Sequence, residues 1–110
     1  MGKSDFDFSK MIIKGQNHYR GNIISIFEEK TTGFSHELDI DGILEPEPTN
    51  AHDPNAVILR VHGFAVGYIA QEFAKSVKSQ IGSGVKVQCK LIWNHDPEHP
   101  IFSVVIKSIE

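Results

Sequence analysis

Cysteine is almost absent from the sequence, which has a single one, Cys89, among its 110 residues. One cysteine can form no disulfide within the chain and cannot build a cysteine-based metal cage. Long apolar runs are absent as well: no segment approaches the length of a transmembrane helix, and the first eight residues do not resemble a signal peptide. These absences indicate a reducing environment, and we expect a cytoplasmic protein without membrane contact.

A surplus of basic residues is also missing. The chain has 11 lysines and arginines against 14 aspartates and glutamates, which gives a formal net charge of −3. Proteins that grip long nucleic acids nonspecifically usually carry a basic surplus. Any contact with DNA is therefore expected to be local and to depend on shape rather than on a long electrostatic track.

Catalytic motifs are equally scarce. The Gly-Ser-Gly stretch at residues 82–84 follows a predicted helix instead of preceding one, so it ends that helix and does not form a phosphate-binding loop. Cys89 falls on the apolar face of a predicted strand, where it is expected to pack in the core rather than act as a nucleophile. The sequence thus predicts neither an enzyme nor a cofactor, and an ATP-driven step would need a separate ATPase or a repair or restriction partner protein.

The length of the chain indicates one folded domain, since 110 residues can build one core but not two. Its hydrophobic content of 40% and charged content of 23% are typical of a soluble globular protein. Residues 1–21 fit neither the helical nor the strand period cleanly. We therefore expect an N-terminal extension over residues 1–21 and a single barrel domain over residues 22–110.

The spacing of apolar residues predicts six strands and one main helix. Strands are expected at residues 22–27, 36–44, 56–61, 65–69, 85–93 and 101–109. Between residues 70 and 81 the apolar positions follow a helical period, with Phe73, Ala74 and Val77 on one face. Because βαβ alternation is absent, we expect a mainly β fold: a small six-stranded antiparallel barrel with the helix packed at one opening.

Residues 45–57 form a proline-framed loop between two of these strands. Its three prolines fix φ, remove backbone donors and disfavour the helical region for the residue before each of them. The loop carries compact hydrogen-bonding side chains, a usual composition for a binding site held between core strands: Thr49, Asn50, His52, Asp53 and Asn55. A purely structural turn would also favour Asn and Asp, so that alternative stays open.

Two motifs in this part of the chain resemble those of the HIRAN domain, a module of certain SWI/SNF-type DNA-repair ATPases that also occurs alone in bacteria and phages. The family pattern E-P-x-N-x-x-D-x-N-A-I is met by residues 47–57, and the following pattern G-x-x-V-G-Y-I is met by residues 63–69. Two motifs in the right order and at the right distance are more specific than either alone. The resemblance covers roughly residues 22–110 and implies a barrel related in shape to OB-folds.

The resemblance also implies a function, because HIRAN domains of repair ATPases capture the free 3′ end of single-stranded DNA. Asp53 matches the family's aspartate, whose carboxylate accepts a hydrogen bond from a 3′-hydroxyl and repels a phosphate. Asn50 matches an asparagine that can donate to a phosphate oxygen or a sugar. His52 stands where relatives use a tyrosine to stack on a base.

Two further positions are implied at the entry to the helix. Tyr68 stands where a relative has a histidine near the DNA, and Gln71 stands where that relative has a lysine. Backbone donors at the start of this helix could face a phosphate. With Thr49 from the loop, Tyr68 and Gln71 complete the set of DNA-binding residues expected in and after the proline-framed loop.

One part of the family pattern is not met. Relatives that bind DNA carry an arginine followed by two aromatic residues in the loop after the first strand, and in this sequence residues 28–34 occupy that region. Only Lys30 and Phe34 could substitute there, while Glu28 and Glu29 oppose DNA by their charge.

Two other function classes remain open from the residues. A protein-interaction barrel could use Phe64 and Trp93 as exposed anchors, or a basic patch of Lys75, Lys78, Lys86 and Lys90. A metal-binding domain or metal-dependent hydrolase could use four potential ligands close together in one turn: His95, Asp96, Glu98 and His99. The prolines in that turn exclude a zinc-protease helix, and a solvated hairpin loop explains the same residues.

Overall fold

The computed structural model describes residues 12–30, 37–94 and 102–109. These residues form six strands: β1 (Ile13–Lys14), β2 (Glu37–Pro46), β3 (Val57–Val61), β4 (Phe64–Ile69), β5 (Val85–Trp93) and β6 (Phe102–Ile109). A short 3₁₀ helix, η3 (Gln16–Tyr19), leads into α1 (Arg20–Lys30), and α2 (Gln71–Ile81) joins β4 to β5. Among the helices described, none is long and apolar enough to cross a membrane.

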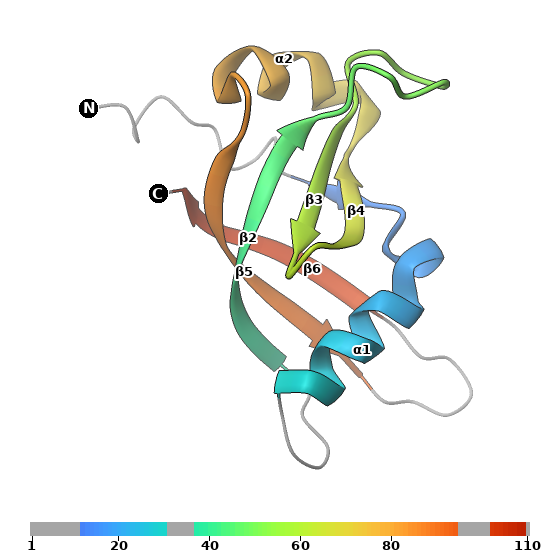
Figure 1. Cartoon of the computed structure of the whole chain (residues 1–110), viewed down its shortest axis with the longest axis vertical. Coiled ribbons are helices and arrows are strands. Elements are labelled where there is room, and N and C mark those ends of the chain that lie inside the picture. The colour runs from blue at the N-terminus through green and yellow to red at the C-terminus, as the bar shows by residue number, and fades with distance from the viewer. Residues whose placement is uncertain (1–11, 31–36, 95–101, 110) are drawn as a thin grey trace.

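The strands form one antiparallel sheet in the order β1-β4-β3-β2-β5-β6. The sheet curls into a nearly closed barrel, with α2 across one end and α1 at the other (Figure 1). The predicted fold class, a small six-stranded OB-like barrel with a main helix at one opening, is therefore confirmed.

The core fills the inside of this barrel with side chains from every strand. Leu44, Leu59, Val66, Val87 and Leu91 are fully buried. Helix α2 adds apolar residues at helical spacing, namely Ala74, Val77 and Ile81. Since α2 joins β4 to β5, this packing fixes the start of α2 next to the end of β4, where the candidate site lies.

Residues 22–27 are helical, so the strand predicted there is wrong. The segment is rich in isoleucine, which favours strands, but Ile23, Ile26 and Phe27 are spaced as neighbours on one helical face and are all buried. A short apolar run cannot by itself distinguish a strand from a buried helix, and here packing against the barrel decides. Asn22 Nδ2 donates a 2.8 Å hydrogen bond to the carbonyl of Ala65, which ties the start of α1 to β4.

The first strand is instead β1, which lies within the segment expected as an extension. Ile13 pairs with Ile69 and Lys14 pairs with Tyr68, and Ile13 is buried. The two strands approach so closely at Gly67 that an added Cβ would lie 2.5 Å from Cγ2 of Ile13. A glycine at this position is therefore required by the docking of β1 against β4.

Strands β3 and β4 form the predicted hairpin, closed by a turn in which His62 and Gly63 both have positive φ. The register shifts by one residue within the hairpin: Leu59 pairs with Gly67, whereas Arg60 pairs with Ala65. Val66 is thus an extra residue in β4, which is a β-bulge. The shift sets the register of the strand half that carries Tyr68.

Candidate functional site

The proline-framed loop is a compact structure closed by backbone hydrogen bonds. The amide of Glu47 donates to the carbonyl of Ala56 at 2.8 Å, which holds the two ends of the loop together. Inside it, the amide of Asn50 donates to the carbonyl of Glu47, and the amide of Ala56 donates to the carbonyl of Asp53, both at 3.0 Å. Strand β2 extends to Pro46, two residues further than predicted, so the loop proper begins at Glu47.

The side chain of Asn50 braces this loop from within. Its Oδ1 accepts hydrogen bonds from the backbone amides of His52 (2.9 Å) and Asp53 (3.0 Å). Its Nδ2 donates to Oε1 of Glu47 at 2.9 Å. Asn50 therefore fixes the backbone at His52 and Asp53, as expected for an asparagine in a turn.

The two carboxylate oxygens of Asp53 have different surroundings. Oδ1 accepts a 2.9 Å hydrogen bond from the amide of Asn55, which is an Asx turn. Within the described part of the chain, Oδ2 has no hydrogen-bond partner. One oxygen thus orients the side chain, and the other is an acceptor with no protein donor.

Tyr68 is held in place from two sides. Its hydroxyl donates a 2.7 Å hydrogen bond to Oε1 of Glu47, and its ring lies 6.2 Å from that of Tyr19 at an interplanar angle of 46°. Burial, reinforced by hydrogen bonding to Glu47 and Tyr19, raises the pKa of the Tyr68 hydroxyl well above its usual value. The phenol therefore stays protonated and acts as a donor across the physiological range.

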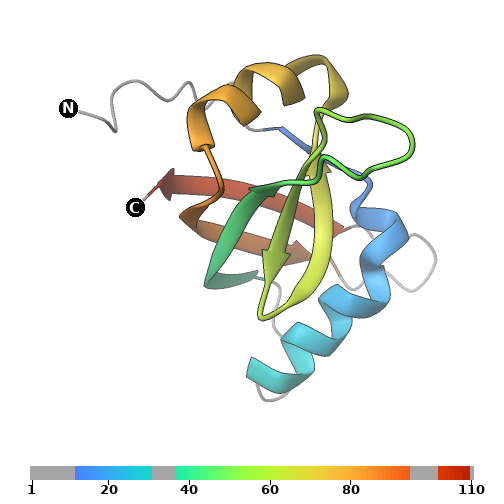
Figure 2. The ribbon, with the colours of Figure 1, turned by 45° about the horizontal axis from the view of Figure 1, so that its top comes forward.

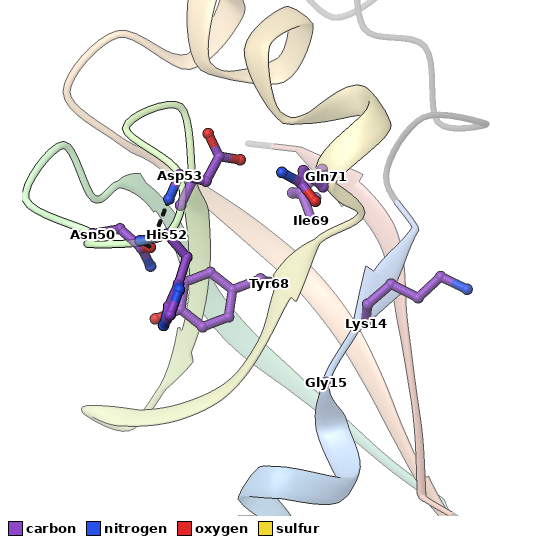
Figure 3. A pocket seen from close by; sticks show the side chains of 9 residues that line it. Lys14, Gly15, Asn50, His52, Asp53, Tyr68, Ile69 and Gln71 are labelled. Carbon is purple, nitrogen blue, oxygen red and sulfur yellow. Dashed lines mark hydrogen bonds between the residues drawn. The ribbon is translucent and has the colours of Figure 1, made fainter.

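These side chains meet at a pocket of about 320 Å³ between the loop, β1, the end of β4 and the start of α2 (Figure 3). Figure 2 shows the backbone of the loop beside the start of α2. Five of the predicted site residues line it: Asn50, His52, Asp53, Tyr68 and Gln71. The lining is completed by Lys14, Gly15, Ala56 and Ile69. Residues from the two sequence motifs are thus gathered around one cavity.

The pocket lies at the start of α2, where the N-cap residue is Ala70, which makes no side-chain capping bond. The amide of Ala70 donates to the carbonyl of Ile12 at 2.7 Å, so this helix start is also tied to the segment that leads into β1. Gln71, the first residue of α2, is exposed and lines the pocket. An uncapped helix start has backbone donors and a partial positive charge, which favour an anionic group nearby.

The remaining predicted site residues lie elsewhere. Thr49 is exposed in the loop but does not line the pocket, and Lys30 is exposed at the end of α1. Phe34 lies outside the described residues, as do the candidate metal ligands His95, Asp96, Glu98 and His99. Across residues 12–30, 37–94 and 102–109, the structure brings together no group of three or more histidine, cysteine, aspartate or glutamate side chains that could hold a metal ion.

Sequence reasoning missed the wall contributed by β1. Because residues 22–27 are helical, the segment after the first strand is not residues 28–34 but Gly15 and η3, which contains His18 and Tyr19 and is followed by Arg20. His18 and Arg20 are exposed, and Tyr19 contacts Tyr68. Gly15 was the available signal, since its positive φ marks the turn that precedes His18 and Tyr19.

Several of the residues weighed for protein interaction are partly buried or already have a partner. Phe64 and Trp93 are partly buried against the core, and the Trp93 ring lies 5.6 Å from that of Phe102. Lys78 Nζ donates to the carbonyl of Pro54 at 2.9 Å, and Lys90 Nζ lies 3.5 Å from Glu37 Oε1. Lys75 and Lys86 are exposed.

A second pocket, of about 370 Å³, lies on the outer side of β2 and β3 and was not predicted. It is lined by residues of both charges: Asp41, Glu45, Arg60, His62 and Lys86, together with Gly42, Ile43 and Gly63. Arg60 is already paired there, since its Nε donates to Glu45 Oε1 at 2.7 Å. This pairing makes the second pocket less suited than the first to an anionic ligand.

Comparison with known proteins identifies a domain family. The family model of the HIRAN domain matches residues 36–107, which are most of the chain and include both sequence motifs, the loop and α2. No curated protein and no solved structure matches the chain.

Proposed function

The chain belongs to the HIRAN domain family, whose members are nucleic-acid-binding modules, and from this premise we propose that it binds the 3′ end of single-stranded DNA in the pocket beside the proline-framed loop. The proposed role is recognition without chemistry. A process that needs ATP would draw on a separate partner protein.

The observation that carries the proposal is that only one of the two carboxylate oxygens of Asp53 is hydrogen-bonded within the described residues. Oδ1 is fixed by the amide of Asn55, while Oδ2 has no donor within the described residues, and the residue lines the pocket. A 3′-hydroxyl can donate to such an oxygen, whereas a 3′-phosphate or an internal phosphodiester would bring negative charge against it. This arrangement supports selection of a free hydroxyl end.

The side of the pocket facing Asp53 has the opposite character. Lys14 from β1 and Gln71 at the uncapped start of α2 line the cavity opposite the loop. Figure 3 shows the Gln71 side chain on the side toward the loop and the Lys14 side chain extending away from it, so Lys14 would have to turn inward to reach a ligand. A cation, an amide and a helix start are all suited to a phosphate oxygen. In the proposed complex they contact the phosphate that precedes the terminal nucleotide.

Rings around the pocket supply surfaces for a base. His52 is exposed and lines the cavity, and Tyr68 lines it as well, with its ring 6.2 Å from that of Tyr19. Stacking of a base on such a ring contributes ~1–3 kcal/mol and depends little on sequence. We therefore expect recognition of an end rather than of a base sequence.

The direct test compares short single-stranded oligonucleotides that differ only at the 3′ end. We expect tighter binding of a strand ending in a 3′-hydroxyl than of the same strand ending in a 3′-phosphate, or of a hairpin whose 3′ end is paired. An RNA strand of the same sequence, measured in parallel, decides between DNA and RNA. Equal weak binding of the three DNA forms would refute end recognition.

A further inference from the structure

We propose that Glu47 is the positioning residue of this pocket, because one oxygen of its carboxylate holds side chains from two separate walls. The inference rests on the function proposed above and adds a residue that does not itself line the cavity. Glu47 directly follows β2, and its side chain is only 24% exposed. It therefore acts on a ligand through its neighbours.

The two walls meet at Oε1 of Glu47. This oxygen accepts a 2.7 Å hydrogen bond from the Tyr68 hydroxyl and a 2.9 Å hydrogen bond from Nδ2 of Asn50. Asn50 belongs to the loop and Tyr68 to β4, and both line the pocket (Figure 3). Hydrogen bonds to a carboxylate are shorter and stronger than those between neutral groups, so this pair fixes the position of the loop relative to β4.

Asn50 in turn holds His52 and Asp53, the two loop residues proposed to contact DNA. Once Nδ2 of Asn50 is bound to Glu47, its Oδ1 is oriented toward the amides of His52 and Asp53, which donate to it at 2.9 and 3.0 Å. An Asn50 amide released from Glu47 is free to rotate, and both backbone contacts then weaken. The position of the Asp53 carboxylate thus depends on Glu47 through two hydrogen bonds in series.

A neighbouring carboxylate offers a matched control. Glu45 lies in β2, and its Oε1 accepts the 2.7 Å hydrogen bond from Arg60 Nε. Arg60 reaches Glu47 only at 3.9 Å, between Nη2 and Oε2. Replacing Glu45 removes the same charge beside the same arginine, but within the described residues it breaks no hydrogen bond to Asn50 or Tyr68.

The substitutions at position 47 separate charge from hydrogen bonding. Glu47→Met keeps the length of the side chain and removes the acceptor. Glu47→Gln keeps one oxygen, which can accept both hydrogen bonds, and removes the charge. If Glu47 positions the loop through its hydrogen bonds, Glu47→Gln should keep most of the amide protection and affinity that Glu47→Met loses. If only the negative charge of Glu47 matters, the two variants should lose equally, and if only its bulk matters, neither should lose.

The first measurement uses the free protein and needs no ligand. We expect hydrogen exchange at the amides of His52 and Asp53 to be at least ~10-fold faster in Glu47→Met than in the unmodified protein, and within ~3-fold of it in Glu47→Gln and Glu45→Met. Asn50→Asp tests the same contact from the loop side, because it keeps the acceptor for the two amides and replaces the donor to Glu47 with a second carboxylate. Unchanged exchange at both amides in Glu47→Met, or in Asn50→Asp should Glu47→Met not fold, would overturn the proposal.

The second measurement is the affinity for a strand ending in a 3′-hydroxyl. We expect a loss of ~10-fold or more in Glu47→Met and of less than ~3-fold in Glu47→Gln and Glu45→Met. Faster exchange with unchanged affinity would overturn the link between Glu47 and the ligand. If the unmodified protein binds no oligonucleotide, the proposed function fails on its own, and the exchange data still decide whether Glu47 positions the loop.

Discussion

The hydroxyl of Tyr68 donates a 2.7 Å hydrogen bond to the carboxylate of Glu47 and so connects the end of β4 to the residue that follows β2. The two residues belong to different sequence motifs, one in the loop and one in the hairpin. Their contact explains why both motifs contribute to one site, since neither segment alone encloses the pocket.

Removing this contact should lower the stability of the protein. We expect Tyr68→Phe to reduce the free energy of unfolding by ~1–2 kcal/mol, because a partly buried carboxylate loses a donor while the aromatic ring is kept. Urea unfolding followed by the fluorescence of Trp93 measures the change. A loss below ~0.3 kcal/mol would mean that water replaces the phenol without cost.

The charge of Asp53 should control discrimination between ends. Asp53→Asn keeps an oxygen that can accept the hydrogen bond from the Asn55 amide, so the loop should stay folded. We expect this variant to lose most of the preference for a 3′-hydroxyl over a 3′-phosphate, because it no longer repels phosphate.

Binding of the two oligonucleotides to Asp53→Asn and to the unmodified protein gives the comparison. If the asparagine variant discriminates as strongly as before, the carboxylate does not read the end, and another group of the pocket must do so.

Gly67 should be intolerant of a side chain. Gly67→Ala would place a Cβ 2.5 Å from Ile13 Cγ2 and 3.0 Å from the Lys14 carbonyl, so β1 must move away from β4. We expect a loss of ~1–3 kcal/mol in stability and weaker oligonucleotide binding, since Lys14 and Gly15 line the pocket.

Gly21→Ala is the matched control for this substitution. Position 21 lies in α1, and a Cβ there meets nothing within 4 Å. We expect it to raise stability by up to ~1 kcal/mol, because alanine is the better helix former. Similar thermal unfolding of the two variants would contradict the close approach of β1 to β4.

The protein should lose stability in alkaline solution. Burial raises the pKa of the Cys89 thiol from its usual value near 9 to about 12, and the charge of Asp41 contributes in the same direction. The unfolded chain therefore releases this proton at a lower pH than the folded one, and stability falls as pH rises from about 9 toward about 12. Tyr68, whose pKa is also raised, acts in the same sense.

Unfolding free energies at neutral pH and at about pH 10.5 measure this loss. Cys89→Ala should show a smaller decrease between the two conditions than the unmodified protein, even if its stability at neutral pH is lower because of the cavity. Equal decreases would show that Cys89 does not contribute to the alkaline transition.

Salt should weaken the proposed complex only modestly. The chain has a net charge of −3, and the pocket offers one lysine and one helix start to a phosphate. With about one or two phosphate contacts, affinity for a single strand should fall by ~3- to 7-fold between about 50 and 200 mM salt. A fall of several hundredfold would indicate a longer track of contacts on the surface.

The barrel could be predicted where the apolar period was regular and long. The hairpin of β3 and β4, helix α2 and strands β5 and β6 all lie where alternation or helical spacing indicated them. The prediction of a strand at residues 22–27 was wrong. β-Branched residues favour strands locally, but the burial of Ile23, Ile26 and Phe27 against the barrel favours a helix. Packing of this kind is not visible in a window of six residues.

The part of the candidate site that comes from the two sequence motifs and the start of α2 could be predicted. Asn50, His52, Asp53, Tyr68 and Gln71 line one pocket, although their roles toward DNA remain predictions. The side formed by Lys14 and Gly15 was missed, because β1 has two residues and no detectable period. Its place depends on pairing with β4, a contact distant in sequence, and on the missing side chain of Gly67.

The extra residue Val66 in β4 has a consequence for variation of the hairpin. Because Val66 has no partner in β3, deleting it would leave the Arg60–Ala65 and Leu59–Gly67 pairs as consecutive rungs of a regular ladder. Tyr68 would keep its pairing with Ile58 and stay beside Glu47. A second deletion before Tyr68 would find no bulge to absorb it and would turn the phenol to the opposite face of the strand. This hairpin should therefore keep its register on losing one residue and lose it on losing two, an order that a small deletion series can reveal.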